Sequence, residues 1–403
     1  MSEKVKNSDD KKKSPWLNST VAGASLTSFL SDLSHEVVTV LLPSFLMALG
    51  APAYALGIIE GVSDGLSSFA KLFAGYYADK LGRRKEFAFW GYVTTGIFPA
   101  IAALSTTWPM VLFARGLGWI GRGIRGPPRD AILAKSVEQK DLGKAFGLHR
   151  AGDTLGAIAG PVVAFLLLSY AGIKDIFLLA AVPGMLAAAV FFLLVHEKNP
   201  APSGNNKTLI GSMKGFSSSF KRFLAAVLVF GVADFSHTLL IAFVVASLTP
   251  SIGFIQASAT GILLYTVRNI VYAAASYPFG ALGDRFGRRK ILGAGYIVAV
   301  LTFVGFMVAP PNIFAYALLF AMAGLFIAAE DCLEGAITGE LVEEKERAFG
   351  FGALATANGI GDFASSIIIG ALWAVYGYPA GFAFSAVVGS IGAIALMWPE
   401  KQV

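Results

Sequence analysis

The chain has 403 residues, of which 55% are hydrophobic and only 14% are charged. Because soluble proteins contain about 25% charged residues, this composition excludes an ordinary soluble enzyme. Lysine and arginine exceed aspartate and glutamate by six, but the excess lies in short segments between apolar runs. We therefore attribute it to membrane topology and not to nucleic-acid binding. The single cysteine, Cys332, excludes an internal disulfide.

Twelve apolar segments are long enough to cross the roughly 30 Å hydrocarbon layer of a membrane as helices. We expect them at 20–49, 54–79, 86–105, 109–133, 143–170, 175–196, 217–249, 257–283, 290–309, 312–339, 347–376 and 378–398. The start of the chain is polar and rich in lysine, which predicts a tail over 1–16 and no cleavable signal peptide.

The breaks between these spans alternate in charge. Those after spans one, three, five, seven, nine and eleven are short and almost free of Lys and Arg, whereas the others carry clusters such as Arg83-Arg84-Lys85. Positive residues stay on the cytoplasmic side. The pattern predicts a multi-pass protein of the cell membrane with both termini, including a second tail at 399–403, in the cytoplasm.

One polar segment rich in Pro, Gly and Ser, at 198–216, divides the spans into two sets of six. We expect bundles over 17–197 and 217–398 with this segment as a cytoplasmic linker. The halves also resemble each other, because Asp32-Leu-Ser34-His35 recurs as Asp234-Phe-Ser236-His237, 202 positions later. Ala145-Phe146-Gly147 recurs as Ala348-Phe349-Gly350 at an offset of 203. These offsets indicate an internal repeat.

The most specific motif also occurs twice, 205 positions apart. Gly75 to Lys85 and Gly280 to Lys290 both read G-x-x-x-D-[KR]-x-G-R-R-K between apolar runs. This motif resembles the loop between the second and third helices of major facilitator superfamily transporters, and the matching loop between the eighth and ninth. The resemblance covers nearly the whole chain. It implies an all-α polytopic membrane protein with twelve transmembrane helices in two pseudo-symmetric six-helix bundles.

The resemblance also implies that the motif works as a cytoplasmic gate. A carboxylate at the end of span two can face a helix N-terminus or pair with an arginine, and so hold the two halves together in one conformation. The alternative is that the basic residues only set topology. The residues assigned to the gate are Gly75, Asp79, Gly82, Arg83, Arg84, Gly280, Asp284, Gly287, Arg288 and Arg289.

Span five contains Gly152, Gly156, Gly160 and Pro161 at the spacing G-x-x-x-G-x-x-x-G-P. Small residues at every fourth position let helix backbones approach closely, and proline kinks a helix. The run from Gly156 to Pro161 is also similar to an antiporter-associated motif of the family, which favours export. The following Val162-Val163-Ala164 departs from that motif, so helix packing alone is an equal alternative.

Span four carries several arginines. Arg115, Arg122 and Arg125 fall within an arc of roughly 80°, and Arg129 would join them if the helix continues through Pro127-Pro128. A buried arginine costs about 2.5–3.5 kcal/mol, so this face must meet carboxylates, water or an anionic ligand. We expect Arg122 to be deep in the protein, and Arg125 and Arg129 to lie near the cytoplasmic surface, where they set topology.

Charged residues flanked by apolar sequence are expected to face a water-filled interior and to serve in proton coupling or substrate binding. They are Asp32, His35, Glu36, Glu60, Asp64, Arg115, Arg122, Asp153, Asp234, His237, Arg268, Glu330, Asp331 and Glu334. Some must be structural ion pairs, and we expect Arg150 to pair with Asp153. A carboxylate beside a histidine can load and release a proton near neutral pH. Asp32 with His35, and Asp234 with His237, are therefore the proton-coupling candidates.

The same four residues could instead ligate a divalent transition metal, since they offer nitrogen and oxygen ligands. The sequence contains no His-rich tract or Cys cluster that would support this alternative. It contains no phosphate-binding loop after a strand and no extramembrane domain with a nucleophile motif. An enzyme is therefore excluded.

We predict a secondary transporter that moves a small polar or amphiphilic solute by alternating access, coupled to protons and directed outward. Its cavity should be lined by spans one, two, four, five, seven, eight, ten and eleven. Its expected partners are the solute, protons and the lipid bilayer, with the proton gradient in place of a cofactor and a monomer as the working unit. The alternatives are a divalent-metal exporter and a membrane sensor that does not transport.

Overall fold

The computed structural model describes residues 16–138, 142–197, 216–342 and 347–398, and every regular element in these ranges is a helix. The N-terminal bundle contains α1 (Ser19–Ala48), α2 (Ala53–Leu81), α3 (Arg84–Ala103), α4 (Trp108–Ser136), α5 (Leu142–Leu168) and α6 (Ile173–Leu194). The C-terminal bundle contains α8 (Ser218–Gly231), α9 (His237–Ile252), α10 (Phe254–Phe286), α11 (Arg288–Val308), α12 (Ile313–Leu341), α13 (Arg347–Tyr376) and α14 (Tyr378–Met397). The predicted tails and linker lie outside the described residues, except at Trp16 and Phe216.

The helices confirm the all-helical architecture and eleven of the twelve predicted spans to within a few residues. Seven helices in the described part of the chain are long and apolar enough to cross a membrane by composition alone. Others of similar length, such as α2 and α4, are less apolar because they carry the charged side chains discussed below. Helix α4 runs through Pro127 and Pro128, so Arg129 does belong to the same helix as Arg115.

The exception is the seventh span, which we expected to be one helix over 217–249. It is broken into α8 and α9, with residues 232–236 between them. Ser365 Oγ donates a 2.8 Å hydrogen bond to the backbone oxygen of Asp234, and Ser236 N donates a 3.2 Å bond to Ser366 Oγ. Because backbone groups at membrane depth must be satisfied within the protein, these hydroxyls make the break possible.

The related segment of the first half, around Asp32, is a continuous part of α1. At the repeat offset of 203, the residues of α5 that correspond to Ser365 and Ser366 are Val162 and Val163. Valine offers no side-chain hydrogen bond to a broken backbone. The two halves therefore share a sequence motif but differ in backbone structure at this point.

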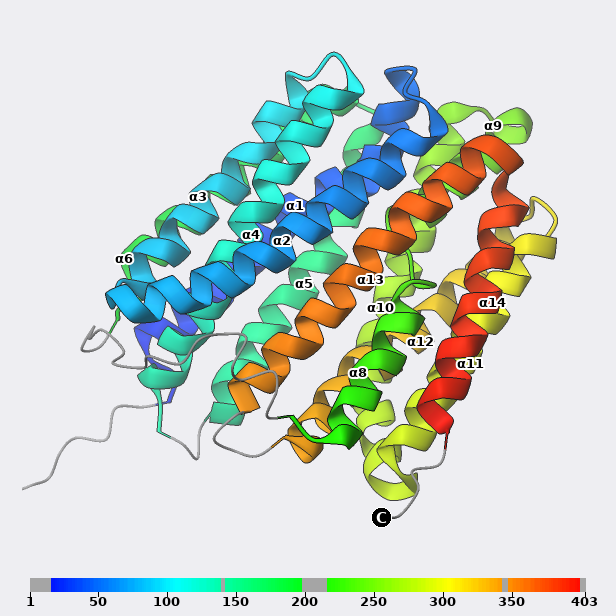
Figure 1. Cartoon of the computed structure of the whole chain (residues 1–403). Coiled ribbons are helices and arrows are strands. Elements are labelled where there is room, and N and C mark those ends of the chain that lie inside the picture. Colours follow the sequence, from blue (N-terminus) through cyan, green and yellow to red (C-terminus); the bar gives the residue numbers. More distant parts are fainter. Residues whose placement is uncertain (1–15, 139–141, 198–215, 343–346, 399–403) are drawn as a thin grey trace, which may run out of the picture.

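The two bundles lie side by side in Figure 1, with α2 and α13 at their junction. We call the end of the molecule that carries the loops after α2 and after α10 the motif face; it points toward the lower left in Figure 1. Gly82 and Gly287 stand in these two loops with φ of 65° and 100°. This left-handed conformation favours glycine, so both copies of the motif turn the chain in a similar way.

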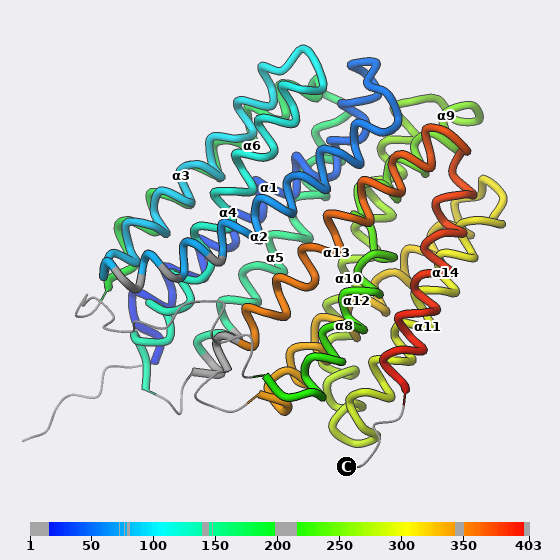
Figure 2. Tube along the Cα trace, in the orientation of Figure 1, coloured from blue at the N-terminus to red at the C-terminus, as the bar shows by residue number. Residues whose placement is uncertain are grey.

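The bundles join most closely at the face opposite the motif face, where α2 begins and α13 ends (Figure 2). A Cβ atom added to Gly57 would lie 2.9 Å from Gly370 Cα, and one added to Gly61 would lie 2.8 Å from Phe363 O. Close to the same face, Ser44 of α1 donates a 2.7 Å hydrogen bond to Ser258 of α10. The opposite face is therefore closed by direct contact between the bundles.

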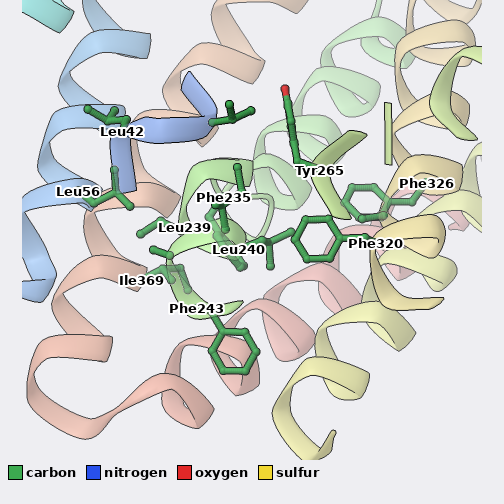
Figure 3. Packing of buried hydrophobic residues seen from close by; sticks show 14 of the residues in the cluster. Leu42, Leu56, Phe235, Leu239, Leu240, Phe243, Tyr265, Phe320, Phe326 and Ile369 are labelled. Carbon is green, nitrogen blue, oxygen red and sulfur yellow. The ribbon is translucent and has the colours of Figure 1, made fainter. Parts of the chain in front are cut away.

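A hydrophobic core continues across the junction. Figure 3 shows Leu42 and Leu56 from the N-terminal bundle near Leu239 and Ile369 from the C-terminal bundle, and all four are buried in one cluster. Phe235, in the break between α8 and α9, belongs to the same cluster. The break is thus anchored by apolar packing on one side, while its polar residues face the cavities described next.

Candidate functional site

A cavity of about 660 Å³ lies between the two bundles. Its walls are His35, Glu36, Asp64, Ser67, Ser68, Lys71, Trp119, Arg122, Arg150, His237, Asp331, Glu334, Gly335, Phe351, Leu354, Ala355, Asn358, Gly359 and Asp362. They come from α1, α2, α4, α5, α9, α12 and α13, which includes most of the spans predicted to line a cavity. Volumes of 300–1,000 Å³ are typical of sites for small molecules.

A second cavity of about 220 Å³ extends from the first, with which it shares Asp64, Trp119, His237 and Asp362. It is also lined by Glu60, Asp234, Phe235, Ser236, Leu240, Arg268, Phe303, Ala323, Phe326 and Ile327. The break between α8 and α9 thus forms part of its wall, as expected for irregular backbone at membrane depth.

Trp119 connects the charged groups of the N-terminal bundle. Its indole nitrogen donates a 2.7 Å hydrogen bond to Asp64, and its ring lies 3.5 Å from the guanidinium carbon of Arg115. The ring centroid of His35 lies 4.4 Å away in an edge-on arrangement. Trp119 was not singled out from the sequence. Its position four residues after Arg115, on the same face of the helix, was the available signal.

Arg115 is almost fully buried and forms an ion pair with Glu60, 2.9 Å between Nη2 and Oε1. It also donates a 3.1 Å hydrogen bond to Thr39. The other oxygen of Glu60 accepts a 3.1 Å hydrogen bond from Ser236 of the C-terminal bundle. This buried network positions α2, α4 and the helix break relative to one another.

Arg122 lies closer than Arg115 to the C-terminal end of α4 and has a different environment. It lines the larger cavity, and its guanidinium carbon is 6.0 Å from the ring centroid of Trp119. It has no hydrogen-bond or ion-pair partner among the residues that the structure describes. A charged group facing a cavity without a partner can bind a ligand of opposite charge without first giving up a protein contact.

Asp32 pairs with Arg125 and not with His35. Arg125 is 3% exposed and pairs with Asp32 at 3.4 Å, while its other nitrogen donates to Ser31. Arg125 is therefore buried inside the protein, where the carboxylate on α1 compensates its charge; its position near the cytoplasmic surface stays a prediction. Asp32 lines neither cavity and forms no ion pair with His35 in the described structure, because its side chain turns toward Arg125 of α4.

Glu36 and the two histidines, His35 and His237, lie on the wall of the larger cavity. Glu36 accepts a 2.9 Å hydrogen bond from the hydroxyl of Tyr265, which belongs to α10 of the other bundle. The ring of His237 stacks on Tyr265 with centroids 4.8 Å apart. Asp234 and His237 both line the smaller cavity but are not in contact within the described structure. Neither predicted carboxylate–histidine pair is therefore a direct pair.

The C-terminal bundle contributes carboxylates to the site. Glu334 is 2% exposed and accepts hydrogen bonds from Tyr296 at 2.6 Å and Asn358 at 2.8 Å. Asp331 and Asp362 also line the larger cavity, whereas Glu330 is buried outside both cavities. Polar residues such as Asn358 and Tyr265 were not singled out from the sequence, although each interrupts an apolar span.

Of the fourteen charged residues predicted to face the interior, ten line one or both cavities. The other four are Asp32, Arg115, Asp153 and Glu330. Asp153 lies 3.4 Å from Arg150 and 3.8 Å from His149. The expected pairing of Arg150 with Asp153 is present.

The glycines of span five pack against α1. A Cβ atom added to Gly156 would lie 2.6 Å from Phe29 O, and one added to Gly160 would lie 2.6 Å from Glu36 Cβ. Gly152 meets the backbone of Ser25 in the same way. The stripe therefore permits close contact between α1 and α5, and Pro161 lies inside the helix after it. This packing does not test the antiporter interpretation.

Four of the gate residues form ion pairs within their own bundle. Arg288 pairs with Asp284 at 2.8 Å and with Glu340 at 3.2 Å, all in the C-terminal bundle. In the N-terminal bundle, Arg83 lies 3.7 Å from Glu86 and Arg84 lies 4.0 Å from Glu197. The side chain of Asp79 lies outside the described part of the chain. A gate that joins the two bundles remains a prediction.

The metal-ligand hypothesis gains no support. Within the described ranges, no group of three or more His, Cys, Asp and Glu side chains is placed to hold a metal ion. Asp32, one of the proposed ligands, is engaged by Arg125.

Comparison with known proteins agrees with this architecture. Among solved structures, a nucleoside transporter superimposes with a TM-score of 0.80 at 15% identity, over 94% of this chain and 99% of that chain. A bacterial homolog of the human lysosomal transporter Spinster, in an inward-facing and occupied conformation, gives a TM-score of 0.75 at 16% identity, over 93% and 95% of the chains. At these identities the similarity shows the fold.

Sequence comparisons show the family. The chain is 34% identical over 353 residues to an uncharacterized MFS-type transporter of Methanocaldococcus jannaschii, covering 87% of each chain. It is 26% identical over 289 residues to the multidrug resistance protein MdtG of Escherichia fergusonii, covering 69% of each. The family model described as Major Facilitator Superfamily matches residues 24–260 and 223–402. The chain is therefore a member of the major facilitator superfamily, a multi-pass membrane transporter and not an enzyme.

Proposed function

We propose that the protein is a proton-coupled secondary transporter that exports a small polar or amphiphilic solute across the cell membrane by alternating access. The observation that carries this proposal is the guanidinium of Arg122, which has no ion-pair partner among the described residues and lines a cavity of about 660 Å³ between the two bundles. A charge held at membrane depth without a partner is costly, so its retention favours a role in solute binding.

The arrangement of the bundles supports alternating access. By the positive-inside rule, we expect the basic loops of the motif face to lie in the cytoplasm, and we predict the same location for both termini. The bundles close on each other at the opposite face through Gly57, Gly370 and the Ser44–Ser258 contact. The residues that line the larger cavity from α12 and α13, such as Asp331 and Phe351, lie toward the motif face. We therefore interpret this conformation as open to the cytoplasm.

We place proton coupling at Asp234, which lines the smaller cavity beside the helix break together with Arg268. Asp32, its counterpart in the repeat, is held by Arg125 and faces neither cavity, so a structural role suits it better. Export is supported by the similarity to a protein named for multidrug resistance, and by the G-x-x-x-G-P run of α5.

Transport in proteoliposomes tests the proposal. A panel of labelled organic cations, anions, zwitterions and sugars is offered with and without an imposed pH gradient, to the wild type and to Arg122→Gln. We expect gradient-stimulated flux of at least one solute, and a loss of at least tenfold in Arg122→Gln. Equal flux with and without the pH gradient would exclude proton coupling. Wild-type flux in Arg122→Gln would exclude Arg122 from the binding site.

A further inference from the structure

We propose that the transported solute is a zwitterion, with its anionic group bound by the N-terminal bundle and its cationic group bound by the C-terminal bundle. This inference rests on the proposed transport function and specifies its substrate class. It comes from the way charge is divided between the two walls of the larger cavity.

Among the residues that the structure describes, every lysine and arginine on the wall of the larger cavity belongs to the N-terminal bundle. These residues are Lys71 of α2, Arg122 of α4 and Arg150 of α5. Arg150 is partly neutralised by Asp153 at 3.4 Å. Lys71 and Arg122 form no ion pair with any residue that the structure describes. This wall therefore offers two cationic groups to an anion such as a carboxylate.

The wall contributed by the C-terminal bundle has the opposite charge. It carries Asp331, Glu334 and Asp362, and the structure places no lysine or arginine of this bundle on it. Glu334 is already occupied by the hydroxyl of Tyr296 and the amide of Asn358. Asp331 accepts a hydrogen bond from the hydroxyl of Tyr272. Asp362 forms no ion pair among the described residues, so it remains available to an ammonium group.

Two carboxylates also stand on the basic wall, but both are engaged. Glu36 accepts from Tyr265 at 2.9 Å, and Asp64 accepts from the indole of Trp119 at 2.7 Å. Within the described ranges, Lys71 and Arg122 are therefore the cationic groups of that wall that form no ion pair. Phe351 and Leu354 add apolar surface to the cavity, which suits a zwitterion that carries an apolar side group.

A zwitterion fits this division better than a singly charged solute. A solute with one charge satisfies one wall and leaves the charges on the other wall without partners, which is unfavourable in a confined site. A zwitterion satisfies both and connects the two bundles across the cavity. Since a ligand shifts a conformational equilibrium only through its differential affinity, this connection would favour closure of the motif face around the solute.

Binding to the purified full-length protein provides the test. The probes are leucine, alanyl-leucine and alanyl-alanyl-leucine, which differ in the separation of their charges. Each is compared with its C-terminal amide, which lacks the negative charge, and its N-acetyl form, which lacks the positive charge. Isothermal titration calorimetry gives the affinities. We expect at least one zwitterion to bind ten or more times tighter than both of its singly charged forms.

Variants assign the two ends of the ligand. Arg122→Gln should abolish the preference over the amide, and Asp362→Asn should abolish the preference over the acetylated form. Lys174→Gln and Asp175→Asn are matched controls, because both residues lie in the first turn of α6, exposed and outside the cavity. The controls should keep both preferences.

Equal or tighter binding of a singly charged form, or no binding of any zwitterion, would overturn the proposal. The proteoliposome panel separates this failure from that of the transport function. Gradient-driven flux of a singly charged or neutral solute would refute the zwitterion alone. The absence of flux for every solute in the panel would refute the proposed function as well.

Discussion

Glu60 of α2 accepts a 3.1 Å hydrogen bond from Ser236, which stands at the break between α8 and α9 in the other bundle. The same carboxylate pairs with Arg115 at 2.9 Å. A buried ion pair of one bundle is thus joined to the irregular backbone of the other. Any movement of the bundles that separates α2 from α9 must replace this contact, so we regard it as part of the conformational cycle.

Glu60→Gln should destabilise the protein strongly, because it leaves the charge of Arg115 buried without its partner. Loss of one member of a buried ion pair costs about 3–5 kcal/mol. Thermal unfolding of the purified protein measures the effect as a fall in Tm. Glu86→Gln is the control, since the Arg83–Glu86 pair is 64% exposed on both sides and such pairs contribute about 0–1 kcal/mol.

The double variant Glu60→Gln/Arg115→Met sharpens this prediction. Replacing both partners removes the stranded charge, so part of the lost stability should return. If Glu60→Gln alone melted at the same temperature as Glu86→Gln, the buried pair would not contribute to stability as we suggest.

A cross-link between Ser44→Cys and Ser258→Cys should stop transport. The two hydroxyl oxygens are 2.7 Å apart on opposite bundles, so a disulfide there should hold the opposite face closed. The experiment requires Cys332→Ser as background, because Cys332 is the single natural cysteine. Flux should fall on oxidation and return on reduction, and each single-cysteine variant should be insensitive. Unchanged flux in the oxidised, cross-linked protein would argue against opening at that face.

Asp234→Asn should separate transport from the proton gradient. We expect gradient-driven flux to fall at least tenfold, while exchange of solute across the membrane without a gradient continues, because exchange needs no net proton movement. Asp32→Asn serves as the comparison. It should reduce stability by leaving Arg125 unpaired but retain stimulation by the gradient. The opposite pattern would assign coupling to Asp32.

Gly156→Ala should weaken the contact between α1 and α5. The added methyl group would lie 2.6 Å from Phe29 O, so the helices must move apart, and overpacking of this kind costs about 1–3 kcal/mol. Gly126→Ala is matched to it, because a Cβ at Gly126 meets nothing within 4 Å. Thermal melts of the two variants should differ clearly. Equal Tm values would show that α1 and α5 accommodate a side chain here.

The helical spans could be predicted from the sequence because hydropathy and positive charge reflect the membrane directly. The break near Asp234 could not. Its local motif is the same as that around Asp32, and the difference arises from Ser365 and Ser366 on another helix. A backbone break that depends on partners more than a hundred residues away leaves no local pattern.

The candidate site was predictable as a set of residues but not as a set of pairs. Charges inside apolar spans must face an interior, and most of them do line the cavities. Which charge meets which depends on side-chain direction in three dimensions. Asp32 meets Arg125 instead of His35 for this reason, and Trp119 gains its role only from the groups that surround it.

Alternating access itself is tested most directly by spin-label distances at the two faces. Labels at Leu81 and Phe286, both exposed at the motif face, report on the cytoplasmic opening, and labels at Tyr54 and Tyr376 report on the opposite face. The background again carries Cys332→Ser. With a transported solute and a change of pH, we predict that the first distance shortens while the second lengthens. Distances that stay fixed at both faces, or that both shorten or both lengthen, would contradict alternating access.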